Sequence, residues 1–257
     1  MTGELSAFSR TVYAAAVCAV TLGFAGSASA GPESLREGLF GPRPSERRQF
    51  AAPPIARYIS EDGDVFTLDR THPTPLLKFE NSMEVWVLQP HPAPRGDVIY
   101  KNDLGEPVLR ATRLGGVTVF TDQRPGGSAA ALAGVGNPLR IIPMSAQALL
   151  ERLGQASFRA SRAARRLMVF EAPNISPVSF PLIGDAATVA SEAVVRISRR
   201  PDGSRVLSKF NTIRFIEGRK VAAQVSKGTL QITVAPAQGM AGRPSSERLV
   251  AVAASAR

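Results

Sequence analysis

Short runs in which apolar and polar residues alternate, separated by turn residues, fill the chain from residue 58 to residue 121. Val117-Thr118-Val119-Phe120-Thr121 alternates as a half-buried strand does, and Val85-Trp86-Val87-Leu88 is a compact strand-forming run. The segments 60–64 and 102–105 have the composition of turns and are flanked by such runs, which is typical of hairpins. The pattern predicts an antiparallel meander of about six short strands.

A Gly/Ala-rich segment at 126–138, which we interpret as a loop, leads to the clearest helical pattern of the chain, from Ser145 to Leu167. At the helical period, the apolar residues of this segment fall on one arc roughly 100° wide. Four arginines fall on the opposite side: Arg152, Arg159, Arg162 and Arg166. Ser145 is a suitable N-cap. We expect this arginine stripe to face solvent and to contact anions.

The part after this helix is less regular. Residues 185–197 fit either a helix or the beginning of a strand. Turn residues then separate three apolar runs at 206–216, 221–225 and 229–234, which predicts a second antiparallel meander. The expected fold is therefore a single α+β domain over 57–235, with two meanders and one long amphipathic helix between them.

The amino-terminal thirty residues have the pattern of a cleavable export signal. Thr11 to Phe24 carries no charge over fourteen residues, and Ala28-Ser29-Ala30 provides the small residues that precede a signal-peptidase cut. The apolar run is shorter than the ~20 residues that cross a membrane. Cys18 lies inside that run rather than after it, which argues against acylation. We expect cleavage before Gly31 and a periplasmic or secreted product without a membrane-spanning segment.

The segments that flank the expected domain lack periodicity. Residues 31–56 are rich in Pro, Gly and Arg, and we interpret them as a flexible lead. Residues 236–257 are rich in Gly, Pro, Ser and Ala, and we interpret them as a disordered tail, within which 249–254 could form a short helix or strand.

The charge balance is strongly basic, with 31 Lys and Arg against 21 Asp and Glu and a net charge of +10. Guanidinium groups pair well with phosphate and carboxylate, so an exported chain of this kind is expected to bind an anionic envelope polymer or an envelope protein rather than nucleic acid. The alternative is that the excess is an ordinary solvated surface.

Several chemistries are excluded by the residues present. The single cysteine, Cys18, leaves with the signal, so the mature chain has no disulfide and no thiolate. The motifs G-x-S-x-G, S-x-x-K, G-K-[ST], G-x-G-x-x-G and H-E-x-x-H are absent. Only two histidines occur, His72 and His91, each beside a proline. We therefore predict no metal and no cofactor.

Carboxylate chemistry remains as an alternative, because several acids fall near predicted strand ends. Two of them about 5–9 Å apart could perform acid/base work on a glycan. The acids are Asp69, Glu80, Glu84, Asp97 and Asp103. Most acids in such positions are solvated turn residues, and nothing in the sequence identifies a pair.

The first meander also offers a possible recognition face. Arg110 and Arg113 are candidate anion contacts there, with Trp86 or Tyr100 as stacking surfaces. The simpler interpretation is a solvent face crossed by salt bridges.

Four segments resemble an uncharacterised family of exported Gram-negative proteins that share a domain of unknown function: PLLKFE (75–80), EVWVL (84–88), PAPRGDVIYKND (92–103) and LRATRLGG (109–116). The resemblance implies export and a shared fold but no catalytic residue. The expected function is a non-enzymatic binding or structural module for anionic envelope components or a partner protein; the alternative is a carboxylate-dependent envelope enzyme that acts on glycan.

Overall fold

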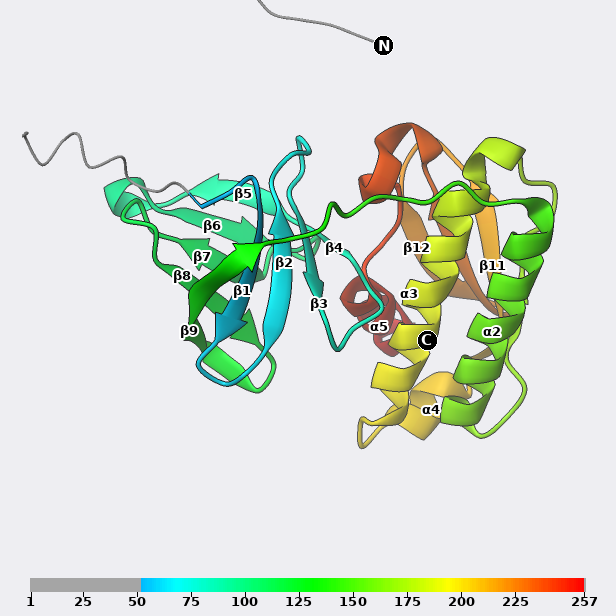
Figure 1. Ribbon diagram of the computed structural model, residues 1–257. Helices are drawn as coiled ribbons and strands as arrows, with labels where there is room; N and C mark the ends of the chain where they lie inside the picture. The colour runs from blue at the N-terminus through cyan, green and yellow to red at the C-terminus, as the bar shows by residue number, and fades with distance from the viewer. Residues whose placement is uncertain (1–51, 257) are drawn as a thin grey trace, which may run out of the picture. The chain divides into compact units, whose positions relative to one another are not determined.

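The computed structural model describes residues 52–256 (Figure 1). The predicted signal peptide, the cleavage site at Ala28, Ala30 and Gly31, and most of the predicted lead lie outside these residues. Within the described part, a large antiparallel sheet is followed by helices packed on a second, smaller sheet. This arrangement confirms the α+β class.

The first half is a nine-stranded sheet in the order β4-β3-β2-β1-β9-β8-β7-β6-β5. Most strands pair with their neighbours along the chain, as expected for a meander. The strands are β1 (Ile55–Ser60), β2 (Val65–Asp69), β3 (Leu76–Phe79), β4 (Trp86–Val87), β5 (Gln89–Pro92), β6 (Val98–Lys101), β7 (Pro107–Ala111), β8 (Val117–Thr121) and β9 (Arg124–Val135).

Alternation along these strands places one set of side chains in a buried core. In β1, Ala56, Tyr58 and Ser60 are buried, while Arg57 and Ile59 between them are more exposed. The ring of Tyr58 stacks on Phe66 of β2 with centroids 5.4 Å apart. The apolar cluster of this half is formed by residues 52–130 alone, so the sheet curves over its own apolar face.

The prediction of a loop at 126–138 is wrong for most of this segment, because β9 extends through it to Val135. Glycine and alanine have little preference for strands. Here β9 is held by hydrogen bonds to β1 on one side and β8 on the other. Gly127 has a φ of +86°, and a Cβ there would lie 2.6 Å from Thr118 Cγ2, so the strand requires glycine at this point.

The second half contains a four-stranded sheet in the order β10-β11-β13-β12, beside four helices. The elements are α2 (Ala146–Ala164), β10 (Val169–Glu171), α3 (Phe180–Ser198), α4 (Gly203–Leu207), β11 (Phe210–Glu217), β12 (Ala222–Ser226), β13 (Gly228–Val234) and α5 (Ser246–Ser255).

This second sheet is mixed, which corrects the expected antiparallel meander. β10 pairs with β11 in parallel, and β11 pairs with β13 in parallel, whereas only β12 and β13 are antiparallel. Parallel neighbours need a crossover connection, and α3 supplies it between β10 and β11. Residues 185–197 are thus helical throughout.

Helix α3 lies between α2 and α5 on the smaller sheet (Figure 1). Twelve of its nineteen residues are buried, because neighbours cover it on several sides. By length and composition, the segment Pro177–Ser198 could cross a membrane, and 67% of its most apolar window is buried inside the fold. That burial is what the core helix of a folded domain shows.

Helix α2 begins and packs as predicted. The Ser145 hydroxyl accepts a hydrogen bond from the Ala148 amide at 3.2 Å, and the helix ends at Ala164, followed by the C-cap residue Arg165 with a φ of +53°. Leu149, Leu153 and Ala156 are buried on the expected apolar face.

The carboxyl-terminal segment is not a disordered tail. After a 3-10 turn at Pro236–Gly242, residues 246–255 form α5, and Leu249 and Ala253 enter the core beside α3. The Ser245 hydroxyl caps α5 by accepting a hydrogen bond from the Arg248 amide at 3.0 Å. The domain therefore extends past the predicted boundary at residue 235.

A candidate ligand-binding cleft

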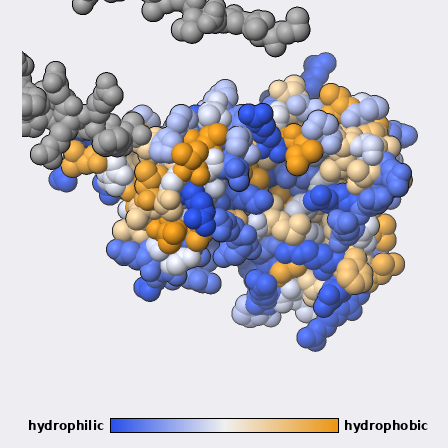
Figure 2. All heavy atoms as spheres, in the orientation of Figure 1, coloured by the Kyte–Doolittle hydropathy of each residue, from blue (hydrophilic) through white to orange (hydrophobic). Residues whose placement is uncertain are grey.

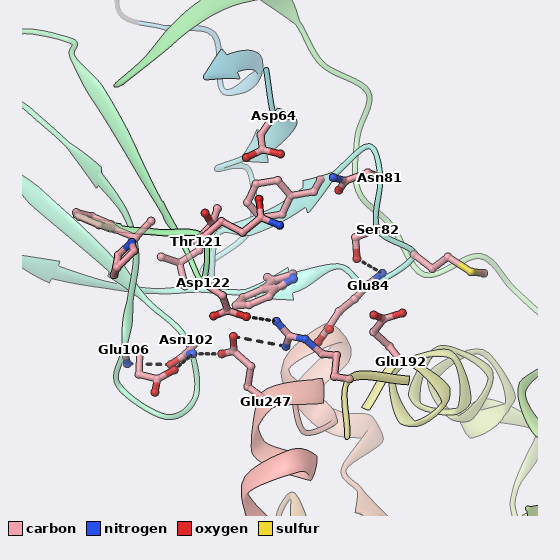
Figure 3. A pocket seen from close by; sticks show the side chains of 18 of the residues that line it. Asp64, Asn81, Ser82, Glu84, Asn102, Glu106, Thr121, Asp122, Glu192 and Glu247 are labelled. Carbon is pink, nitrogen blue, oxygen red and sulfur yellow. Dashed lines mark hydrogen bonds and ion pairs between the residues drawn. The ribbon is translucent and has the colours of Figure 1, made fainter. Parts of the chain in front are cut away.

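A cleft of about 720 Å³ opens where the large sheet meets α3 and α5 (Figure 3). The strands and turns of the large sheet contribute Trp86, Asn102 and Asp122, α3 contributes Arg196, and α5 contributes Glu247. The cleft is therefore built from segments that are far apart in the sequence, and its geometry depends on how α5 is held.

The amino end of α5 is fixed by carboxylates from the large sheet. The Ser245 amide donates to Asp103 at 3.1 Å, and the Ser246 amide donates to Glu84 at 3.0 Å. Free amides and the positive end of the helix dipole favour carboxylates at this position. We call this group of contacts the α5 clasp; it joins the two halves of the domain and forms one wall of the cleft.

Arg243 completes the α5 clasp. Its side chain is only 1% exposed; it donates to Asp185 of α3 and, at 2.6 Å, to the Val85 carbonyl, and it lies 3.9 Å from the equally buried Glu84. Burial raises the pKa of Glu84, which the neighbouring Arg243 and Ser246 only partly offset. A guanidinium in this position is needed to compensate two carboxylates at once.

Arg196 lines the cleft and is the centre of a second network; Figure 3 labels its carboxylate partners Asp122 and Glu247. Its guanidinium lies 3.3 Å from Asp122, 3.5 Å from Glu247 and 3.1 Å from the Ser246 hydroxyl. The same group lies 5.9 Å from the centroid of the Trp86 ring, within the range of a cation–π contact. One arginine thus ties two cleft carboxylates and an aromatic ring together.

Burial raises the pKa of Glu247 to about 7. Arg196 acts against this shift, whereas the neighbouring carboxylates of Glu106 and Asp122 add to it. Asn102 donates to Glu247 and also to Glu106. Glu247 therefore exchanges its proton near neutral pH, where an ordinary glutamate is fully ionised.

The raised pKa of Glu247 predicts a pH dependence of stability. Below about pH 4.5, Glu247 is protonated in both the folded and the unfolded chain, and its contribution to the free energy of unfolding is complete. This contribution is lost as the pH rises from 4.5 to about 7, because the unfolded chain releases the proton first. We expect the free energy of unfolding to fall by about 2 kcal/mol over this window, allowing for partial solvent screening. Urea titrations of the wild type and of Glu247→Gln from pH 4 to 8 measure the difference. A decline of equal size in both proteins would exclude Glu247 as its cause.

Four polar side chains that line the cleft have no hydrogen-bond or ion-pair partner among residues 52–256. They comprise one carboxylate, one guanidinium and two amides: Asp64, Arg199, Asn81 and Gln123. The amides and the guanidinium are exposed. The groups that remain available to a ligand therefore include both hydrogen-bond donors and hydrogen-bond acceptors.

The predicted anion contacts on the large sheet lie away from this cleft. Arg110 donates to Asp97 through Nε at 3.0 Å, and the Arg113 amide donates to the same carboxylate at 3.2 Å. The hydrogen bond from Arg110 is the largest cause that lowers the pKa of Asp97. The arrangement is a salt-bridged pair of strands, and anion binding by Arg110 and Arg113 remains a prediction.

The predicted arginine stripe of α2 is only partly a free surface. Arg159 lines the cleft and binds Glu192 and the Ser191 hydroxyl of α3, while Arg152 lies 3.4 Å from the Thr188 hydroxyl. Arg166 donates to the backbone carbonyls of Leu207, the last residue of α4, and of Phe210, and Arg162 is exposed over the ring of Phe158. The angular pattern placed these residues on one side of α2 correctly, but α3 packs along that side.

Of the five acids singled out in the sequence, only Glu84 lines the cleft. Asp69 is fully buried and accepts hydrogen bonds from Thr71 and the Leu139 amide, and Glu80 pairs with Arg57. Asp97 and Asp103 have the structural roles described above.

The other candidates are also placed by the structure. Trp86 lines the cleft, whereas Tyr100 is buried in the core of the sheet. Within residues 52–256, no three His, Cys, Asp or Glu side chains are arranged to hold a metal ion.

Asn81, Gln123 and Arg196 carry no sequence motif that would select them, because they meet only when three distant segments of the chain come together. Glu247, in contrast, lies in a sequence pattern that could have selected it. Pro244-Ser245-Ser246-Glu247 is a helix start with an acid in the first turn.

These features define an α+β domain with a polar cleft between its two halves. A family model described as a domain of unknown function (DUF4908) matches residues 34–253, and the chain belongs to this family. Neither the curated proteins nor the solved structures contain a match. The family assignment agrees with the expected resemblance to a domain of unknown function.

Proposed function

We propose that this protein is an exported, non-enzymatic binding protein of the cell envelope, whose cleft takes a ligand rich in hydroxyl groups, such as a short glycan segment. The observation that carries the proposal is the set of four unpaired polar groups in the cleft, Asp64, Asn81, Gln123 and Arg199. Hydroxyl groups donate and accept hydrogen bonds, so they match a mixture of amides and opposite charges.

The composition of the lining argues against a polyanion in the cleft. Six acids line it against three arginines, and two of those arginines, Arg159 and Arg196, already pair with cleft carboxylates. The aromatic rings of Phe79, Trp86 and Phe120 supply apolar surface beside the polar groups. A cleft with an apolar wall and a few convergent polar groups is the usual form of a small-ligand site.

The export part of the proposal rests on the amino-terminal pattern. Sequencing the amino terminus of the protein recovered from the periplasm or medium tests it, with Gly31 as the expected first residue. Recovery of a chain that starts at Met1 would contradict export.

Loss of the two free amides should weaken ligand binding without unfolding the protein. We expect Asn81→Ala combined with Gln123→Ala to lower affinity for oligosaccharides released from peptidoglycan roughly tenfold or more, at about 1 kcal/mol for each hydrogen bond. Calorimetric titration of the purified protein measures the effect.

The matched control is Gln155→Ala on the exposed face of α2, which removes an amide outside the cleft. It should leave the affinity unchanged. If the wild type binds none of the oligosaccharides, or if both variants bind as it does, the cleft is not a glycan site.

A catalytic function on the same ligand class has one observation in its favour. Glu247 has a pKa of about 7, and Asp122 lies on the other side of the Arg196 guanidinium, so a protonated and an ionised carboxyl face one cleft. Both acids are tied to Arg196, which leaves neither free to approach a glycosidic bond, and this favours binding. A panel of peptidoglycan and oligosaccharide substrates decides between the two: turnover that Glu247→Gln abolishes would establish the enzyme.

A further inference from the structure

Several arginines gather at one end of the helical half. Helices α2 and α3 run in the same direction, so their carboxyl ends lie together next to α4 (Figure 1). Arg166 confirms this placement, because it donates from the end of α2 to the Leu207 and Phe210 carbonyls. We call the exposed arginines of these segments that do not line the cleft the arginine-rich end: Arg162, Arg165, Arg166, Arg200 and Arg205.

The arginine-rich end carries more positive charge than the fold requires. The acid within its segments is Asp202, which pairs with Arg200 at 2.9 Å and lies 3.8 Å from Arg205. The carboxyl ends of two helices offset about one unit of charge in total. Five arginines against one aspartate therefore leave an anion-attracting surface.

An apolar groove of about 830 Å³ runs between α2 and β10. Large apolar side chains line it, and two of them are mostly exposed: Leu150 at 70% and Leu167 at 72%. The Ser157 hydroxyl in its wall already donates to the Met168 carbonyl at 2.6 Å. The α2 residues that line it, Ala146 to Ser157, span about 16 Å along the helix axis.

The groove and the arginine-rich end are continuous. Leu167 lines the groove and directly follows Arg165 and Arg166 in the chain. Phe158, 66% exposed, lies under the Arg162 guanidinium at 5.8 Å. Hydrophobic and hydrophilic residues lie side by side over these helix ends in Figure 2. An apolar groove with arginines at one end is complementary to a molecule that has an anionic head and an apolar tail.

We propose that this surface binds an anionic lipid, with the headgroup phosphate against the arginine-rich end and an acyl chain in the groove beside α2. Guanidinium groups pair with phosphate oxygens through two hydrogen bonds, and burial of the acyl chain covers Leu150 and Leu167. A soluble polyanion would satisfy the arginines but would leave these leucines in water. This site is separate from the cleft and does not depend on the proposed glycan ligand.

The test uses the full chain and vesicles of phosphatidylcholine alone or with 30 mol% phosphatidylglycerol. We expect sedimentation with the anionic vesicles only. Replacing Arg162, Arg165 and Arg205 with Gln should weaken this binding on the order of 100-fold, at about 1 kcal/mol for each arginine near the surface. A control with Arg140, Arg219 and Lys220 replaced by Gln removes the same charge before α2 and after β11, at the other end of this half, and should bind nearly as the wild type does.

A second variant, Leu150→Ser with Leu167→Ser, tests the acyl groove. It should weaken vesicle binding at least tenfold while leaving binding of soluble polyphosphate unchanged. Equal losses in the two charge variants would overturn the proposal in favour of nonspecific attraction, and full vesicle binding by the leucine variant would overturn it in favour of a soluble polyanion. The Asn81 and Gln123 variant of the cleft should still bind vesicles, which separates the two sites.

Discussion

Replacing Arg243 with alanine is expected to lower the free energy of unfolding by about 3–5 kcal/mol. The substitution removes the cation that lies buried between Asp185 and Glu84 and that binds the Val85 carbonyl. Glu84 is then left nearly without solvent and without its compensating charge, which costs more than the ion pair contributed. Urea denaturation at pH 7, followed by circular dichroism, measures the loss.

Arg248→Ala provides the matched control, because Arg248 also pairs across the two halves, with Asp103 at 2.7 Å. Its side chain is 40% exposed, so its loss should cost about 1 kcal/mol or less. Equal effects of the two substitutions would show that burial of Arg243 has no special role in the α5 clasp.

A chain that stops before Ser245 is expected to fail to fold cooperatively. The truncation removes Leu249 and Ala253 from the core beside α3, and it removes the amides and hydroxyls that bind Asp103 and Glu84. A buried leucine alone contributes about 2–5 kcal/mol, which is a large part of the 5–15 kcal/mol that stabilises a typical domain. Thermal unfolding and limited proteolysis of the truncated protein test this expectation.

A chain that ends at Ala256 retains all of α5 and should unfold as the full-length protein does. A truncated chain with the melting temperature of the full-length protein would mean that the segment after residue 244 is dispensable, as its composition first suggested.

The parts of the fold that the sequence predicts are those governed by local physics. The turn at 102–105 and the alternation of 117–121 produce hairpins whose partners are adjacent in the chain. The α2 helix follows from the N-cap at Ser145 and the 3.6-residue spacing of Leu149, Leu153 and Ala156. These signals need no knowledge of the rest of the chain.

The elements that the sequence does not predict depend on distant partners. The Gly/Ala-rich β9 is a strand because β1, some seventy residues earlier, provides one of its two neighbours. The parallel pairing of β10 with β11 depends on the return of the chain through α3. The cleft is still harder to predict from the sequence, because Asn81, Gln123 and Glu247 are far apart in the chain and come together only through the α5 clasp.

The position of α5 at the end of the chain has a consequence for the order of assembly. A polypeptide that emerges from the ribosome or a translocation channel presents its amino-terminal sheet first and α5 last. The strands from 55 to 135 bury their own apolar core and can pair as they emerge. Glu84, Asp103 and Arg196 cannot form their contacts with Ser245, Ser246 and Glu247 until α5 has been made. The wall that closes the cleft is therefore expected to form last during synthesis, so that the cleft stays incomplete until the whole chain has emerged.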